Sequence, residues 1–174
     1  MPSVVISGFT PMRVTMEPLT SPIKTPVNNP NTSAPGMPIP YFSATALTTP
    51  ASAIVEPTDR SFKHAIDHVR GLAFDAFVAL GGGTAIDTAK AMNLFTTYPA
   101  DLYDYVNKPI GRGQPVPGPL KPMFALPTTA GTGSETTPVI VLDMLDLKLK
   151  TGIAHANIRP TMAIVDPEIT LTQS

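Results

Sequence analysis

Apolar residues between positions 56 and 71 recur with the period of an α-helix. They stand at i, i+3, i+4 and i+7: Phe62, Ala65, Ile66 and Val69. The triplet Pro57-Thr58-Asp59 before them is typical of a helix start, and Gly71 is typical of a helix end. This pattern predicts an amphipathic helix with one apolar face.

Short runs of continuous apolar residues are typical of strands that are covered on both faces. They are AFVAL at 76–80, MFAL at 123–126 and MAIVD at 162–166. Residues 84–95 predict a second helix, and the pair 139–143 and 147–154 predicts a β-hairpin. Strands that alternate with helices in this order predict an α/β fold with a mainly parallel sheet plus the hairpin.

Residues 1–55 differ in composition from the rest of the chain. Eleven of the 21 prolines fall within residues 1–60, and residues 25–55 carry no charge. Proline breaks helices and cannot donate a hydrogen bond to a sheet. We therefore expect a Pro-rich segment of low order over 1–55 and a folded domain over 56–174.

Charge and composition narrow the classes of partner. The net charge of −1 and the pI near 6.3 give no reason to expect nucleic acid or an anionic membrane surface. The absence of cysteine excludes disulfides and thiolate metal sites. No apolar stretch approaches the roughly 18 residues that a membrane span needs. The first residues have the features of neither a signal peptide nor a transit peptide.

The sequence VALGGGTAIDTAK places three glycines between a predicted strand and a predicted helix. A helix N-terminus offers N–H groups and a positive dipole end, and glycines let an anion approach the backbone. Gly81–Thr84 could therefore hold a pyrophosphate. Alternatively, Thr84 and Asp87 have the spacing of a helix cap with an acidic partner, and the glycines form only a tight turn. The spacing is not G-x-G-x-x-G, and both interpretations stay open.

A second small-residue stretch, ALPTTAGTGSETTP, follows the strand predicted at 123–126. Thr128 and Thr129 come at the carboxyl end of that strand, where open α/β sheets bind ligands. Gly131 and Gly133 would let the backbone pass close to such a ligand. We expect Glu135 to lie near a helix N-terminus, where the dipole favours an acid.

The histidines carry no strong metal or catalytic signal. His64 and His68 have the i, i+4 spacing of a metal pair, but they lie opposite the apolar face of the first helix and lack a third ligand nearby in sequence. We interpret them as a solvated helix face. We assign His155 to a turn, and we expect Asp166-Pro167 to end the last strand.

Two of these motifs together resemble a known family. GGGTAIDTAK is similar to the GGGS-x-x-D-x-A-K motif of iron-containing (group III) alcohol dehydrogenases, and PTTAGTGSE and IVDPEITLT are similar to later segments of that family. The resemblance runs from about Glu56 to Thr172 and is strongest to the hydroxyacid-oxoacid transhydrogenase branch. Those enzymes are mitochondrial and oxidise 4-hydroxybutyrate while they reduce 2-oxoglutarate. The GTGSE segment argues against the related glycerol dehydrogenase and dehydroquinate synthase group.

The resemblance implies a nucleotide-binding domain of the dehydroquinate-synthase-like type, which binds NAD(H) or NADP(H) and can form homo-oligomers. The implied cofactor-binding residues are Gly82, Gly83, Thr84, Asp87, Thr128, Thr129, Thr137 and Lys150. Lys150 would reach the cofactor ribose, and this role comes from the resemblance alone.

The sequence also departs from that family. The family holds Fe²⁺ with one Asp and three His of a helical domain, and none of these ligands matches a residue here. We therefore assign no catalytic and no metal-binding residue. The expectation is a truncated part of an iron-dependent dehydrogenase or transhydrogenase that is inactive alone. The alternative is a non-catalytic fragment that binds nucleotide or pairs with another subunit.

Overall fold

The computed structural model describes residues 3–8, 45–50, 57–72 and 74–171. Its main sheet has five strands in the order β2-β1-β3-β4-β7, and each neighbouring pair is parallel. These strands are β1 (Ser3–Gly8), β2 (Thr45–Pro50), β3 (Ala76–Gly81), β4 (Met123–Pro127) and β7 (Met162–Ala163). A separate antiparallel hairpin is formed by β5 (Val139–Met144) and β6 (Leu149–Ala154). The predicted α/β class with a mainly parallel sheet and a hairpin is confirmed.

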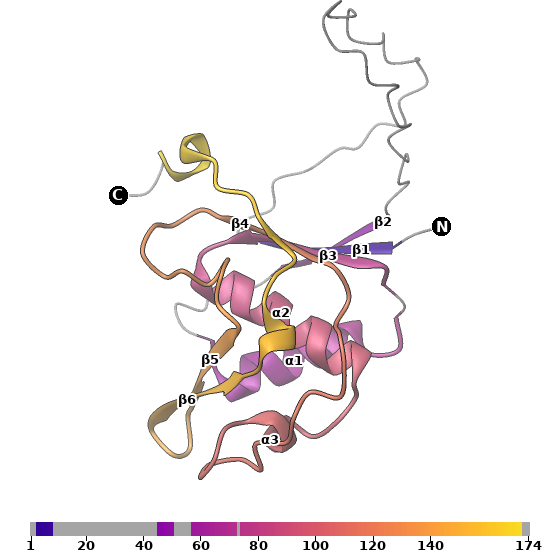
Figure 1. Cartoon of the computed structure of the whole chain (residues 1–174), viewed down its shortest axis with the longest axis vertical. Helices are drawn as coiled ribbons and strands as arrows, with labels where there is room; N and C mark the ends of the chain where they lie inside the picture. Colours follow the sequence, from indigo (N-terminus) through magenta and orange to yellow (C-terminus); the bar gives the residue numbers. More distant parts are fainter. Residues whose placement is uncertain (1–2, 9–44, 51–56, 73, 172–174) are drawn as a thin grey trace, which may run out of the picture.

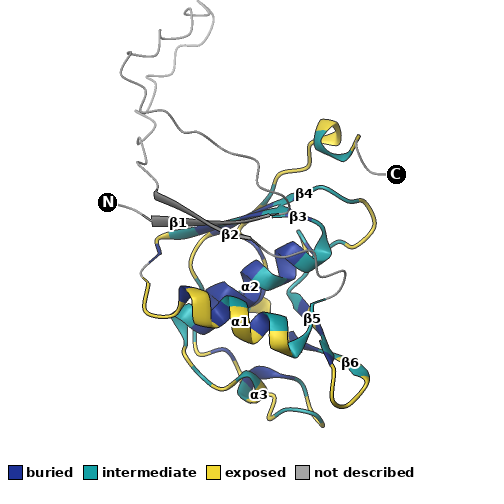
Figure 2. Ribbon diagram, turned by 180° about the vertical axis from the view of Figure 1, so that it is seen from behind, coloured by how far each residue is buried: buried dark blue, intermediate teal, exposed yellow. Residues whose placement is uncertain are grey.

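The longer helices lie on one face of the main sheet (Figure 1). The helices are α1 (Asp59–Val69), α2 (Gly83–Thr97) and α3 (Leu102–Tyr105), with 3-10 turns η1 (Ala156–Ile158) and η2 (Pro167–Thr170). The α2 helix packs between the sheet, α1 and the hairpin, so it is buried along most of its length, whereas α1 keeps one exposed face (Figure 2). None of the helices in the described ranges is long and apolar enough to cross a membrane.

The core has two parts, one on each side of α2. The first lies between α2 and the sheet and includes Phe77, Ile86 and Met123. The second lies between α2, the hairpin and α3 and includes Phe62 and Ile140. Residues on opposite sides of α2 pack into different parts of the core, which explains why the helix is buried on most sides rather than along one stripe.

The first helix forms as its sequence predicts. Thr58 is the N-cap, and it exchanges hydrogen bonds with Ser61 in a capping box. Gly71 has a φ of +78°, the left-handed conformation that ends many helices. His64 and His68 are exposed on the helix surface, as expected for a solvated face.

Two strands come from the segment for which low order was expected. β1 and β2 lie within residues 1–55, so the expectation is wrong for these two stretches. The physical reason is the position of the prolines: none lies within 3–8, and Pro50 is the last residue of β2, where a missing donor costs little. Residues 9–44 and 51–55 lie outside the described residues.

One other local prediction is corrected. The strand expected over 162–166 is only Met162–Ala163, and Asp166 caps η2 by accepting a hydrogen bond from the Glu168 amide at 2.9 Å. Glu135 lies in a turn that leads into β5, in which the amides of Thr136 and Thr137 donate to the Gly133 carbonyl. At the end of the chain a local turn replaces the longer strand that the apolar residues suggested.

Candidate functional site

The turn from β3 into α2 consists of the three consecutive glycines. Gly81 has a φ of +149°, and a Cβ there would lie 2.6 Å from the Cβ of Ala85, so only glycine fits. Gly82 is the N-cap of α2, and no side chain caps the helix there. The alternative in which Thr84 caps the helix with Asp87 as partner is wrong, because the helix begins before Thr84, at Gly83.

The loop after β4 packs directly on this glycine turn. β3 and β4 are paired so that Gly81 stands beside Pro127, and the Thr128 amide donates to the Gly81 carbonyl at 3.0 Å. A Cβ on Gly82 would lie 3.1 Å from Thr129 Oγ1. A Cβ on Gly83 would lie 3.1 Å from Thr132 Cγ2 and 3.2 Å from the Ser134 hydroxyl oxygen. The fold therefore brings the two glycine-rich motifs together at the carboxyl edge of the sheet.

Thr129 carries a polar atom without a partner in the described structure. Its Oγ1 is buried and makes no hydrogen bond. A buried hydroxyl without a partner costs roughly 1–3 kcal/mol of desolvation. The atom packs against Gly82, whose missing side chain lets the threonine approach the backbone at the start of α2. A cradle formed by glycines, an uncapped helix start and an unsatisfied hydroxyl fits the pyrophosphate of a dinucleotide.

Asp87 belongs to a buried polar cluster beside this cradle. It is 4% exposed, and its Oδ2 accepts a hydrogen bond from the Val141 amide at 3.0 Å. Lys90, which is fully buried, places its Nζ 3.2 Å from Asp87 Oδ1. Burial raises the pKa of Asp87, and the charge and hydrogen bonds of Lys90 partly oppose this shift. Burial likewise lowers the pKa of Lys90, against the attraction of Asp87.

Thr137 is joined to the same cluster. Lys90 Nζ lies 3.4 Å from Thr137 Oγ1 and donates to the Val139 carbonyl at 2.7 Å. Sequence reasoning placed Asp87 and Thr137 in the site but missed Lys90, the residue that connects them. The available signal was a charged pair at i, i+3, the only charged residues within the helix.

Lys150 lies apart from the glycine turn. It is on β6 opposite Asp143, with 4.0 Å between Lys150 Nζ and Asp143 Oδ1 and 60% of its side chain exposed. Asp143 is four residues beyond Val139 on β5, or about 13 Å along the strand from the cluster around Lys90. The structure therefore brings the predicted glycines and the Thr128-Thr129 pair together at the edge of the sheet and joins Asp87 and Thr137 through Lys90. It leaves Lys150 further along the hairpin.

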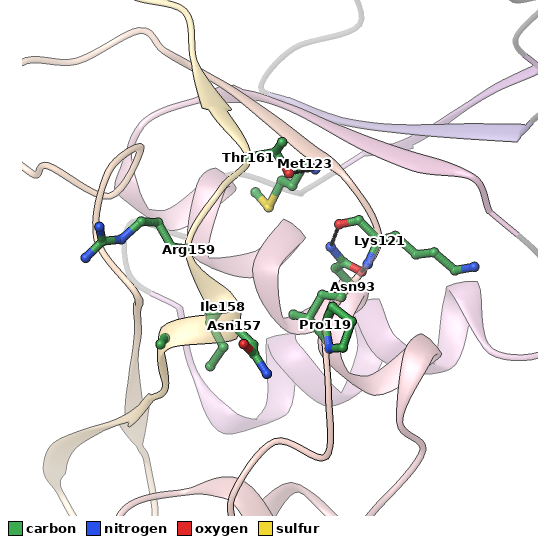
Figure 3. Close-up of a pocket in the computed structure, with 10 residues that line it drawn as sticks. Asn93, Pro119, Lys121, Met123, Asn157, Ile158, Arg159 and Thr161 are labelled. Carbon is green, nitrogen blue, oxygen red and sulfur yellow. Dashed lines mark hydrogen bonds between the residues drawn. The ribbon is translucent and has the colours of Figure 1, made fainter.

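A cavity of about 220 Å³ lies at the other end of α2 (Figure 3). Its lining includes Asn93, Lys121, Met123, Asn157 and Arg159. The Asn93 amide donates to the Lys121 carbonyl at 2.8 Å, and Asn157 donates to Gly118 at 2.8 Å. Lys121 and Arg159 extend away from each other in Figure 3 rather than converging on a common point. The cavity therefore offers volume, but its amide side chains are already engaged by the backbone.

The described part of the chain contains no group of three or more His, Cys, Asp or Glu residues that could hold a metal ion. His155 is the N-cap of η1, and its Nδ1 accepts a hydrogen bond from the Asn157 amide at 3.2 Å. The described residues therefore do not fit an iron centre.

Comparison with known proteins identifies relatives of this fold and these motifs. The family model for "Iron-containing alcohol dehydrogenase" matches residues 46–167. The mitochondrial hydroxyacid-oxoacid transhydrogenase of Bos taurus is 58% identical over 118 residues, which are 67% of this chain and 25% of that protein. This chain thus spans about a quarter of the length of such curated relatives.

Solved structures with the same fold agree with this match. Sulfoacetaldehyde reductase from Bifidobacterium kashiwanohense, in complex with NAD+, superposes with a TM-score of 0.65 at 32% identity, over 75% of this chain and 33% of that one. A 1,3-propanediol oxidoreductase superposes with a TM-score of 0.69 over 99% of this chain and 40% of that one. Its identity of 20% supports the fold alone.

Proposed function

The chain belongs to the iron-containing alcohol dehydrogenase family, and from this premise we propose that it binds NAD(H) or NADP(H) at its two glycine-rich loops. The observation that carries the proposal is the buried, unsatisfied Thr129 hydroxyl, which packs against Gly82 at the uncapped start of α2. The NAD+ complex of the sulfoacetaldehyde reductase supports the choice of a nicotinamide dinucleotide.

Each predicted residue has a physical role in this proposal. Gly82 and Gly83 let the pyrophosphate approach the start of α2, where the helix dipole favours its negative charge. The hydroxyls of Thr84, Thr128 and Thr129 can donate hydrogen bonds to phosphate oxygens. The proposed contact of Lys150 with the ribose rests on the family resemblance.

We extend the proposal to the class of reaction named by the relatives. Bound nicotinamide supplies a hydride acceptor or donor, and the proposed substrates are a hydroxy acid and an oxo acid. Residues 56–174 would form part of the nucleotide-binding domain of such an oxidoreductase. A mitochondrial location is proposed from the names of the relatives.

The direct test is titration of the purified 174-residue chain with NADH and NADPH. The chain has no tryptophan whose emission could be followed. Binding is therefore measured from the emission of the reduced nicotinamide. Saturable binding is expected, and Gly82→Ala should weaken it about tenfold, because the added methyl lies 3.1 Å from Thr129 Oγ1 and narrows the cradle. Absence of binding by either nucleotide would contradict the proposal.

Gly71→Ala is the matched control. Gly71 ends α1 at a φ of +78°, and a Cβ there meets nothing within 4 Å. The substitution strains the backbone and should lower stability by about 1 kcal/mol without changing nucleotide affinity. An equal loss of affinity in both variants would show that Gly82→Ala acts through general destabilisation.

A separate assay addresses turnover. The chain is incubated with Fe²⁺, NAD+, 4-hydroxybutyrate and 2-oxoglutarate, and the oxo and hydroxy acid products are measured. The described residues offer no ligand set for iron, so we expect no rate above that of a protein-free control. A measurable rate would overturn the expectation of inactivity while leaving the nucleotide-binding proposal intact.

A further inference from the structure

Lys90 is a buried cation whose three donors are directed at three different parts of the fold. Its ammonium group reaches Asp87 Oδ1 at 3.2 Å, the Val139 carbonyl at 2.7 Å and Thr137 Oγ1 at 3.4 Å. The side chain is 0% exposed, so it cannot touch a ligand in the cradle. Two of its partners, Thr137 and Val139, belong to the segment that immediately follows the second glycine-rich loop.

The contacts continue from Lys90 back to the glycine turn. Asp87 is hydrogen-bonded to the side chain of Ser134 and to the Val141 amide. Ser134 is itself buried, and its hydroxyl oxygen lies 3.2 Å from the position of a Cβ on Gly83. A chain of packed polar groups thus joins Lys90 to the wall of the cradle through Asp87 and Ser134.

We propose that Lys90 is a positioning residue for nucleotide binding, which holds residues 134–139 against the first turns of α2 so that the loop and the glycine turn form one cradle. The inference rests on the proposed function and concerns the same site. Without Lys90, residues 137 and 139 lose their anchor on α2, and Asp87 loses the cation that fixes its carboxylate beside Ser134. The loop is then free to move away from Gly83.

An apolar residue in place of Lys90 could not hold Thr137 and Val139 on α2. A methionine of similar length fills the same volume but donates no hydrogen bond, whereas the ammonium group has three donors. Asp87 supplies the compensating charge at i−3, and Glu135 adds a second favourable interaction. The pair therefore fixes the geometry of the cluster at a cost in desolvation free energy. Buried charges have this role in some proteins, where they specify position at the expense of stability.

The test compares Lys90→Met, the double variant Asp87→Asn/Lys90→Met, and the surface control Lys63→Met in the full chain. Lys63 is exposed on α1, outside the site. Stability is measured by urea unfolding followed by circular dichroism, and affinity by NADH titration under conditions in which every variant is folded. We expect the dissociation constant for NADH to rise about tenfold or more in Lys90→Met and to stay unchanged in Lys63→Met.

The double variant separates positioning from general stability. It removes the uncompensated charge and should recover most of the urea midpoint, but it cannot restore the anchors at Thr137 and Val139. Affinity should therefore stay low although stability returns. Recovery of both affinity and midpoint would show that Lys90 acts on folding alone and would overturn the inference.

Hydrogen exchange keeps this inference distinguishable from the proposed function. In Lys90→Met, amide protection across Thr136–Val141 should fall more than it does in α1, whether or not nucleotide is present. If wild-type protein binds neither NADH nor NADPH, the proposed function fails and with it the positioning role. If the protein binds NADH but Lys90→Met changes neither exchange nor affinity, only the inference about Lys90 fails.

Discussion

The two ends of α2 differ in whether the polar side chains packed there have hydrogen-bond partners. At its C-terminal half, the helix meets the chain just before β4, and at its start it meets the chain just after β4. The first junction has the cavity of about 220 Å³, but its amide side chains are paired with backbone groups. The second has the unsatisfied Thr129 hydroxyl and glycines that let the loop after β4 pack closely on the start of α2.

We assign the proposed site by its unsatisfied polar group rather than by cavity size. Asn93 is 2% exposed, and it both donates to and accepts from the Lys121 backbone, so this junction is complete as it stands. The Thr129 Oγ1 atom is buried at a cost in free energy that nothing in the described structure offsets. A ligand that accepts a hydrogen bond would remove that cost, and this is the basis for assigning the nucleotide to the start of α2.

The largest predicted effect concerns the buried pair at the start of α2. Asp87→Ala leaves the Lys90 ammonium without its counter-charge and the Val141 amide without an acceptor. The free energy of unfolding should fall by about 3–5 kcal/mol, which urea denaturation measures directly.

A pair with the same sequence spacing provides the control. Asp67 and Arg70 also stand at i, i+3, with 3.0 Å between charged atoms, but both side chains are more than half exposed. Asp67→Ala should change stability by no more than about 1 kcal/mol. Similar losses in the two variants would show that burial does not distinguish the pairs.

The second-largest predicted effect on stability concerns Asn93, in the C-terminal half of α2. Asn93→Ala removes the partner of both the Lys121 amide and the Lys121 carbonyl and should lower stability by about 2 kcal/mol. The affinity for NADH should not change in protein that remains folded, because this junction lies away from the glycine turn. A loss of affinity as large as that of Gly82→Ala would mean that the two ends of α2 are not independent.

Much of this arrangement could be predicted from the sequence, and the remainder depends on long-range contacts. The glycines at 81–83 and the threonines at 128–129 indicated the edge of the sheet that holds the candidate site, because each motif follows an apolar strand. The roles of Asp87 and Lys90 could not be predicted, since the groups they bind lie about fifty positions later in the chain. The helix start also escaped prediction: Thr84 has the residue type of a cap, but the turn is short enough for Gly82 to take that place.

The smallest predicted effects are those of two threonine-to-valine substitutions, one near each end of α2. They test the comparison between the two ends most directly. Thr161 Oγ1 accepts a hydrogen bond from the Met123 amide at 3.1 Å, so Thr161→Val leaves that amide unpaired and should lower stability by about 1 kcal/mol. Thr129→Val deletes a hydroxyl that has no partner and should leave stability unchanged or slightly raised.

Nucleotide affinity should respond in the opposite sense. Thr129→Val should weaken NADH binding about tenfold, because a hydrogen bond to a charged phosphate is worth roughly 1.5 kcal/mol or more, whereas Thr161→Val should leave affinity intact. A variant that gains stability while it loses affinity cannot be explained by damage to the fold. If Thr129→Val instead lowers stability and leaves NADH binding intact, the hydroxyl is satisfied in the free protein and the assignment of the nucleotide to this edge loses its main support.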